Sequence, residues 1–144
     1  RSIAVTGVQT CALPICIRQR SLNVISLTMA IPEHFVLVHR TRMPIRWGDM
    51  DAMGHVNNTV YFRYLEQARI AWFEALDCPP DPLGTGPVII NAHCTFLKQL
   101  RYPGDIEVTT FVGDFGRSSF QTLHQIRRVD SPDIIAAEGG SKVV

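Results

Sequence analysis

The chain has 144 residues, of which 46% are hydrophobic, and its formal net charge at neutral pH is +1. This length and composition are typical of one globular domain with a single core. The near-zero charge argues against a nucleic-acid-binding surface, and there is no run of about 18 apolar residues that would predict a membrane span.

Residues 1–28 differ in composition from the rest of the chain. They hold three arginines, no acidic residue and two of the four cysteines. Residues 1–15 resemble the translation of a sequencing adapter, so we expect residues 1–28 to be a disordered, non-native leader. We expect residues 29–144 to form the domain and to be truncated within or just after the last strand. The other two cysteines, Cys78 and Cys94, lack a CxxC spacing, which predicts reduced thiols in a cytoplasmic protein.

The first predicted strand covers residues 35–47. Apolar side chains, Trp47 among them, fall mostly on one parity, and three arginines fall on the other. This period of two predicts a half-buried strand. Residues 49–58 then form a glycine-punctuated connection, in which Asn57 or Asn58 is suited to cap the following helix.

An amphipathic helix is predicted next. Its apolar positions recur every three or four residues at Tyr61, Tyr64, Leu65, Ala68, Trp72 and Leu76. This spacing predicts about five turns that end near Asp77. The loop that follows is rich in proline and glycine and cannot continue the helix.

Four more strands are predicted in residues 88–100, 106–115, 119–129 and 134–144. The first of them places apolar residues on one side and Asn91, His93 and Thr95 on the other. Because short turns join these strands, we expect antiparallel pairing. One long helix that lies on one curved sheet gives an α+β fold.

The connection before the helix concentrates polar side chains that chemistry can use. It contains Asp49, Asp51, His55, Asn57 and Asn58 within ten residues. Asp51 lies just ahead of a helix start, where exposed backbone N–H groups can stabilise negative charge. The structural alternative for Asp51 is an Asx-turn or capping residue, and for Asp49 a residue that orders the loop.

Residues 49–58, followed by residues 61–66, resemble the hotdog-fold acyl-CoA thioesterases of the 4-hydroxybenzoyl-CoA thioesterase family. Residues 101–105 and 116–120 are also similar to turn segments of that family, and the resemblance covers about residues 35–144. It implies a hotdog fold, in which an antiparallel sheet of about five strands wraps around one long central helix. It further implies a homodimer or homotetramer with acyl-CoA bound between subunits.

The family's catalytic carboxylate lies four residues before the histidine of a His-Val-Asn-Asn segment, which is the position of Asp51. The resemblance therefore implies that Asp51 acts as the nucleophile or general base of thioester hydrolysis. The helix-start N–H groups would then stabilise the oxyanion. This chemistry needs neither a cofactor nor a metal, and no serine elbow, Cys-His pairing or metal motif competes with it.

Several further residues are candidates for contact with substrate, and each has a structural alternative. His55 either orients Asp51, contacts substrate or stabilises the turn, while Glu66 is expected to pair with Arg63 or Arg69. The other candidates for substrate contact are Asn57 and Asn58, which could instead be helix caps, Tyr61 and Tyr64, which could be core residues, and Asn91, His93 and Thr95, which could be ordinary sheet surface. Candidates for contact with the CoA phosphates are Lys98, Arg101, Arg117 and Lys142, which could instead be solvated surface charges.

Three functions remain open at this point. The leading hypothesis is an acyl-CoA thioesterase. The second is an acyl-CoA or acyl-carrier-protein dehydratase or hydratase, which would use Asp51 and His55 as acid and base. The third is a non-catalytic acyl-CoA-binding domain.

Overall fold

A computed structural model describes residues 30–78, 81, 83 and 86–144 of the chain. The expected leader, residues 1–28, lies outside these described residues. The elements in chain order are β1 (Val36–Pro44), the 3₁₀ turn η1 (Trp47–Asp49), α1 (Asn58–Ala75), β2 (Ile89–Phe96), β3 (Asp105–Gly113), β4 (Phe120–Arg128) and β5 (Ser131–Val143).

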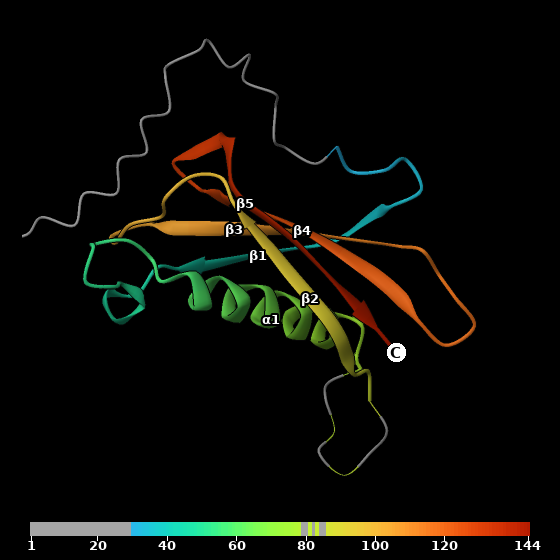
Figure 1. Cartoon of the computed structure of the whole chain (residues 1–144). Helices are drawn as coiled ribbons and strands as arrows, with labels where there is room; N and C mark the ends of the chain where they lie inside the picture. The colour runs from blue at the N-terminus through green and yellow to red at the C-terminus, as the bar shows by residue number, and fades with distance from the viewer. Residues whose placement is uncertain (1–29, 79–80, 82, 84–85) are drawn as a thin grey trace, which may run out of the picture.

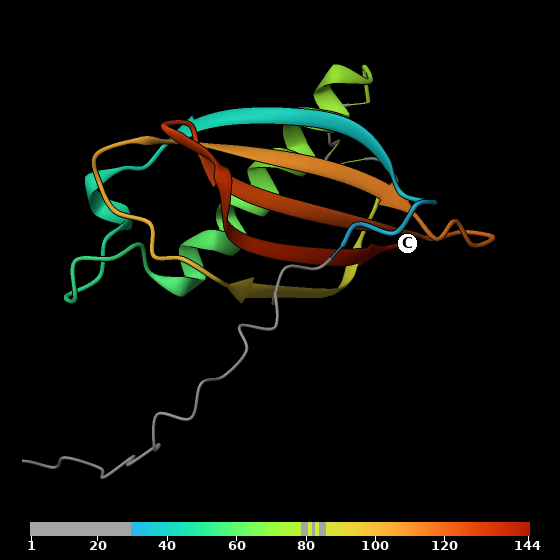
Figure 2. The ribbon, with the colours of Figure 1, turned by 90° about the horizontal axis from the view of Figure 1, so that it is seen from above.

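The five strands form one sheet in the order β1-β3-β4-β5-β2, and every neighbouring pair is antiparallel. The two strands that flank α1 in the sequence are therefore the two edges of the sheet. The helix lies against one face of the sheet (Figures 1 and 2). This arrangement confirms the predicted α+β fold with an antiparallel sheet of five strands and one helix.

The core lies between α1 and the sheet. The helix has 18 residues, and its buried side chains are Tyr61, Tyr64, Leu65 and Ala68, which the three- and four-residue spacing had placed on one face. They pack against apolar side chains of β3, β4 and β5, such as Val108, Ile126 and Ala137. Each large apolar side chain buried in this way contributes about 1.5–3 kcal/mol.

A polar cluster is buried in the sheet beside this apolar core. His124 of β4 is 1% exposed, with Nδ1 3.1 Å from the Thr110 hydroxyl and Nε2 3.1 Å from the Thr122 hydroxyl. The Thr122 hydroxyl lies 2.6 Å from that of Ser141. These paired groups, which we call the His124 cluster, are hydrogen-bonded to one another across three strands.

Two predictions about the strands need correction. β1 ends at Pro44, and Trp47 is 78% exposed in η1 instead of lying on the core side of a strand. β2 covers Ile89–Phe96 instead of the predicted 88–100, and Val88 and Ile90, which belong to the apolar side of that predicted strand, are 59% and 56% exposed. The reason is that β2 is an edge strand whose pairing with β5 is irregular between Ile89 and Asn91.

Candidate functional site

The loop that precedes α1 lies at one end of the sheet, close to the segment that enters β3 (Figures 1 and 2). It is closed on itself by a bridge between Met50 and Val56, and the Asp51 amide donates to the His55 carbonyl at 2.7 Å. Gly54 has a φ of +74°, a value that glycine adopts without strain. The polar residues of the loop are therefore held by backbone hydrogen bonds in one compact turn.

Asp51 uses one carboxylate oxygen to build this turn. Its Oδ1 accepts from the Met53 amide at 2.8 Å and from the His55 amide at 3.2 Å, which is the Asx-turn geometry considered as its structural role. Within the described residues, its Oδ2 has no hydrogen-bond partner. The side chain is half-buried and lines a cavity of about 320 Å³. One oxygen is thus structural and the other is free for chemistry.

This cavity runs between the start of α1 and the end of β2. Its lining residues are Asp51, His55, Val56, Asn58, Tyr61, Phe96, Leu97, Lys98 and Gln99. Asp51 also borders a second, open depression, together with Trp47, Met50 and Tyr102. Asp51 is therefore a residue that both hollows share.

Asn57 caps α1, as predicted for this position or the next. Its Oδ1 accepts from the Thr59 amide at 2.9 Å and from the Thr59 hydroxyl at 2.8 Å. The Val60 amide donates to the Asn57 carbonyl at 2.9 Å. In the described part of the chain, the backbone N–H of Asn58 has no acceptor, and Asn58 lines the cavity. A backbone donor at the positive end of the helix dipole is therefore available beside Asp51.

Asp49 orders the loop from the opposite side. Its Oδ2 accepts from the Tyr64 hydroxyl at 2.7 Å and from the Arg46 amide at 2.8 Å. Burial, and then the hydrogen bond to this carboxylate, raise the pKa of Tyr64 well above its usual value, so the phenol remains a donor. These bonds agree with the structural interpretation of Asp49.

The inner wall of the cavity is aromatic and rigid. Tyr61 is buried, and its hydroxyl accepts from the Leu100 amide at 3.3 Å. Its ring meets Phe96 edge to face, with centroids 4.9 Å apart. Burial raises the pKa of Tyr61, so its hydroxyl stays neutral. Behind it, burial raises the pKa of the Cys94 thiol to about 11, which leaves this cysteine without thiolate character near neutral pH.

His55 is held by Arg101. The Nη2 of Arg101 lies 2.7 Å from the Nε2 of His55. A guanidinium can only donate, so in this contact the imidazole nitrogen is the acceptor. The cation of Arg101 therefore sits beside the cavity that Asp51 lines.

The predicted site residues fall into two groups. Asp51, His55, Asn58, Tyr61 and Lys98 line one cavity, Asn57 caps the helix beside it, and Arg101 contacts His55. His93 and Thr95 are exposed on β2 and do not border this cavity.

Two of the proposed phosphate-binding cations lie elsewhere. Arg117 is in the β3–β4 connection and Lys142 is near the end of β5, at the end of the sheet opposite the loop (Figure 2). Among the described residues, Glu66 forms no ion pair within 4 Å. Burial lowers the pKa of Arg69, and the charge of Glu66 opposes this shift only in part.

Sequence reasoning had not assigned Phe96 and Gln99 to the site. Phe96 was placed on an apolar strand face, and that residue, close to the end of β2, forms part of the cavity wall.

Comparison with known proteins gives a consistent result. Residues 45–144 match the profile of the thioesterase-like superfamily. The structure resembles that of PA2801 from Pseudomonas aeruginosa, a candidate thioesterase, with a TM-score of 0.71 and 42% identity over 76% of this chain and 84% of that one. It also resembles XC229 from Xanthomonas campestris, a candidate acyl-CoA thioesterase, with a TM-score of 0.71 and 33% identity over 76% of this chain and 92% of that one.

A sequence relative is the uncharacterised protein YsmA of Bacillus subtilis. It is 28% identical over 85 residues, which are 59% of this chain and 57% of YsmA. The match thus spans a little more than half the length of that relative. Among the described residues, no helix is both long and apolar enough to cross a membrane.

Proposed function

The chain belongs to the thioesterase-like superfamily, and we propose that it is an acyl-CoA thioesterase whose reaction is carried by Asp51. The observation that supports this proposal is that Asp51 and Asn58 line the same cavity, and that among the described residues neither the Asp51 Oδ2 nor the Asn58 backbone amide has a hydrogen-bond partner. Such a pairing of a carboxylate with a backbone donor is what thioester hydrolysis needs: a group that attacks or activates water, and a group that stabilises the oxyanion.

The proposed reaction breaks the bond between the acyl carbon and the sulfur. The Asp51 carboxylate either attacks the carbonyl carbon itself or takes a proton from a water that attacks it. The carbonyl oxygen, which gains negative charge, accepts from the Asn58 amide.

Direct attack expels CoA as the thiolate and leaves a mixed anhydride of Asp51, which a water then hydrolyses; in the other route the activated water itself displaces the thiolate. In both routes the products are the acid and CoA, whose thiolate takes up the proton released from water. A single turnover in labelled water distinguishes the routes when the water opens the anhydride at the Asp51 carboxyl carbon, because the first acid then carries an unlabelled Asp51 oxygen and the label stays in Asp51.

The substrate class is proposed from what surrounds Asp51. Tyr61 and Phe96 offer an apolar, aromatic wall for the acyl group. Lys98 and Arg101 provide positive charge at the same cavity for the phosphates of CoA. The similarity to XC229, a candidate acyl-CoA thioesterase, supports the same class.

We also propose that the active unit is a homo-oligomer assembled through β2. This strand is a sheet edge with exposed apolar side chains, Ile90 and Phe96, and its end borders the cavity. Exposed edges pair readily with other strands. A second copy that pairs there would extend both sheets over the two helices and close the cavity from outside.

Free Cys78 and Cys94 agree with a cytoplasmic location.

Dehydratase or hydratase chemistry has less support at this site. It needs a second acid or base beside Asp51, and the Nε2 of His55 already accepts from Arg101.

The thioesterase proposal is tested by a screen for thiol release over short-chain, medium-chain, long-chain and aryl CoA thioesters, with hydration of an enoyl-CoA measured in parallel. We expect release of CoA thiol from saturated esters. Hydration without thiol release, or binding without turnover, would contradict the proposal.

A further inference from the structure

The turn that leads into β3 connects the proposed site to the rest of the sheet. Three of its backbone groups contact neighbouring segments. The Leu100 carbonyl accepts from the Val56 amide at 2.9 Å, and the Gly104 carbonyl accepts from the Ile45 amide at 2.8 Å. The Tyr102 amide lies 3.4 Å from the sulfur of Met50. The conformation of residues 100–104 therefore determines where the Asp51 loop sits.

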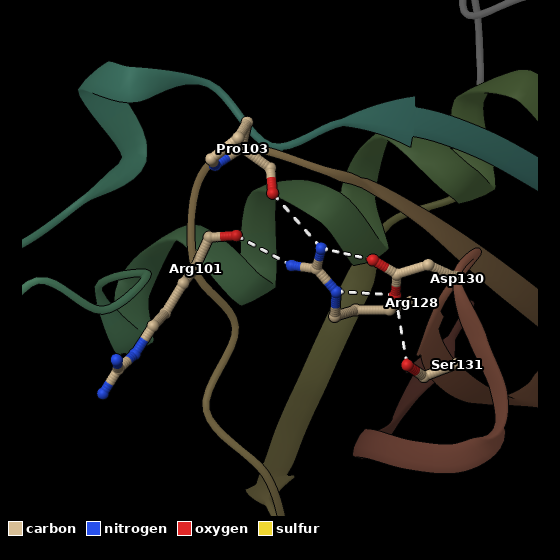
Figure 3. A network of polar contacts seen from close by, with 5 residues as sticks. All are labelled: Arg101, Pro103, Arg128, Asp130 and Ser131. Atoms are coloured by element: carbon tan, nitrogen blue, oxygen red, sulfur yellow. Dashed lines mark hydrogen bonds and ion pairs between the residues drawn. The ribbon is translucent and has the colours of Figure 1, made fainter.

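Arg128, at the end of β4, holds this turn from the other side (Figure 3). Its Nη1 donates to the Arg101 carbonyl at 2.8 Å, and its Nη2 donates to the Pro103 carbonyl at 3.2 Å. Its Nε and Nη2 donate to the two carboxylate oxygens of Asp130 at 2.8 and 2.7 Å. The Ser131 hydroxyl donates in turn to Asp130 at 3.2 Å.

Gly104 makes room for this arrangement. A Cβ at position 104 would lie 2.3 Å from the Nη2 of Arg128, and the residue has a φ of +149°. Any side chain there would displace the guanidinium and strain the backbone. The turn and the guanidinium are thus fitted to each other.

The Arg128–Asp130 pair differs from an ordinary surface ion pair. Exposed pairs contribute little because both side chains remain mobile and solvated. Here the planar guanidinium binds the Asp130 carboxylate through two nitrogens, and it also donates to two backbone carbonyls. The Arg128 side chain is 24% exposed. The hydrogen bond to Asp130 also raises the pKa of Arg128 and lowers that of Asp130.

We propose that Arg128 is a positioning residue for the Asp51 site: it fixes the turn so that Arg101 meets His55 and the Leu100 carbonyl anchors Val56. Among the described residues, Arg128 forms no hydrogen bond with Asp51 or with a side chain that lines the cavity, so we infer that it acts through this turn. The kinetic part of this inference rests on the proposed thioesterase function. The geometric part does not.

The test compares Arg128→Met with Arg42→Met. Arg42 pairs with Glu107 on the sheet surface, so its replacement makes the same chemical change away from the site. We expect amide exchange at Val56, followed by NMR, to be about tenfold faster in R128M and unchanged in R42M. The nitrogen shifts of the His55 ring should lose the signature of an accepting Nε2 in R128M only.

The kinetic arm uses whichever CoA thioester the wild-type protein hydrolyses. R128M should lower kcat by about 10- to 100-fold, with a smaller change in KM, because a displaced loop misplaces the reacting groups. R128K, which keeps one donor for the carbonyls, should recover part of the loss, and R42M should match the wild type. Unchanged exchange at Val56, or unchanged kcat in R128M, would overturn the inference.

The experiment remains decisive if the wild-type protein proves inactive or if R128M does not fold. A wild-type protein that hydrolyses no thioester would reject the proposed function, while the exchange and nitrogen-shift measurements would still decide the role of Arg128. If R128M does not fold, Asp130→Asn serves instead, since it removes the charge that orients the guanidinium but keeps the guanidinium. D130N should then speed exchange at Val56 by several-fold, and unchanged exchange would overturn the inference.

Discussion

The Asp51 loop and the His124 cluster are both concentrations of polar side chains, yet they have opposite characters. In the His124 cluster, both ring nitrogens have hydroxyl partners and the whole group is buried. In the loop, Asp51 lines a cavity and has one carboxylate oxygen that no described residue pairs with. The difference shows that polar residues alone do not mark a reactive site. A reactive site differs from a structural cluster because it has an unused hydrogen-bonding group that a ligand can reach.

The largest expected effect tests Asp51 against its neighbour Asp49. Asp51→Asn should lower kcat for thioester hydrolysis by about 10²- to 10⁴-fold while the protein stays folded, because the carboxylate is lost from the reacting position. Asp49→Asn makes the same change of charge two residues away. It should lower the free energy of unfolding by about 1 kcal/mol, because the Tyr64 hydroxyl loses a charged acceptor.

Thiol-release assays and urea unfolding of both variants measure these effects. If D49N lost as much activity as D51N, the division between a structural and a reactive aspartate would be wrong.

Replacement of the buried histidine should have the next largest effect, and on stability alone. His124→Leu leaves the buried Thr110 hydroxyl without its partner and removes one partner of the Thr122 hydroxyl, which keeps Ser141, so the free energy of unfolding should fall by about 2 kcal/mol. The kcat should stay within about twofold at a temperature where the variant is folded, because a substitution away from the site changes stability and not the reacting groups. Urea denaturation gives the first value. A selective loss of kcat would instead make the cluster part of the site.

The pH dependence of stability sharpens the same contrast. Burial, and then the charges of Arg69 and His93, lower the pKa of His124 from 6.5 to about 3. Between these pH values the unfolded chain binds a proton that the folded chain does not. The free energy of unfolding contributed by this residue should therefore be complete above pH 6.5 and fall by up to about 1.4 kcal/mol per pH unit below it.

Urea denaturation from pH 7 to pH 4 checks this slope, with H124L as the control. The difference between the wild type and H124L should shrink as the pH falls. A difference that stayed constant across this range would contradict the burial of a neutral histidine.

The smallest expected effect concerns the start of α1. Asn57→Ala removes the side-chain acceptor of the Thr59 amide and hydroxyl, and should lower the free energy of unfolding by about 1 kcal/mol. Asn57 holds the helix and does not line the cavity, so kcat should change little. A thermal melt together with a thiol-release assay separates these effects, and a loss of activity near that of D51N would assign Asn57 to the reaction.

Local patterns predicted much of this molecule. The helix followed from apolar residues that recur at three- and four-residue spacing, and the antiparallel sheet from short turns between strands. The cap at Asn57 and the placement of Asp51 just before the helix also depend on residues close in sequence. These features were predictable because the interactions that produce them span a few residues.

Features that depend on distant segments were missed. The period-two pattern continues to Trp47, but β1 ends at Pro44, where its pairing with Asp105 of β3 ends. Arg128 reaches the Arg101 carbonyl across 27 residues of sequence. No periodicity within one strand carries information on such contacts.

A crystal structure of the protein with a 2-oxoalkyl thioether of CoA, which is not hydrolysed because a methylene separates its ketone carbonyl from the sulfur, tests the central claim most directly. We predict that the carbon standing for the scissile carbonyl lies within about 3.5 Å of the Asp51 Oδ2, or of a water that this oxygen holds. The carbonyl oxygen should point toward the Asn58 amide. An analogue bound with its sulfur remote from Asp51, and with that carboxylate facing solvent, would contradict the account.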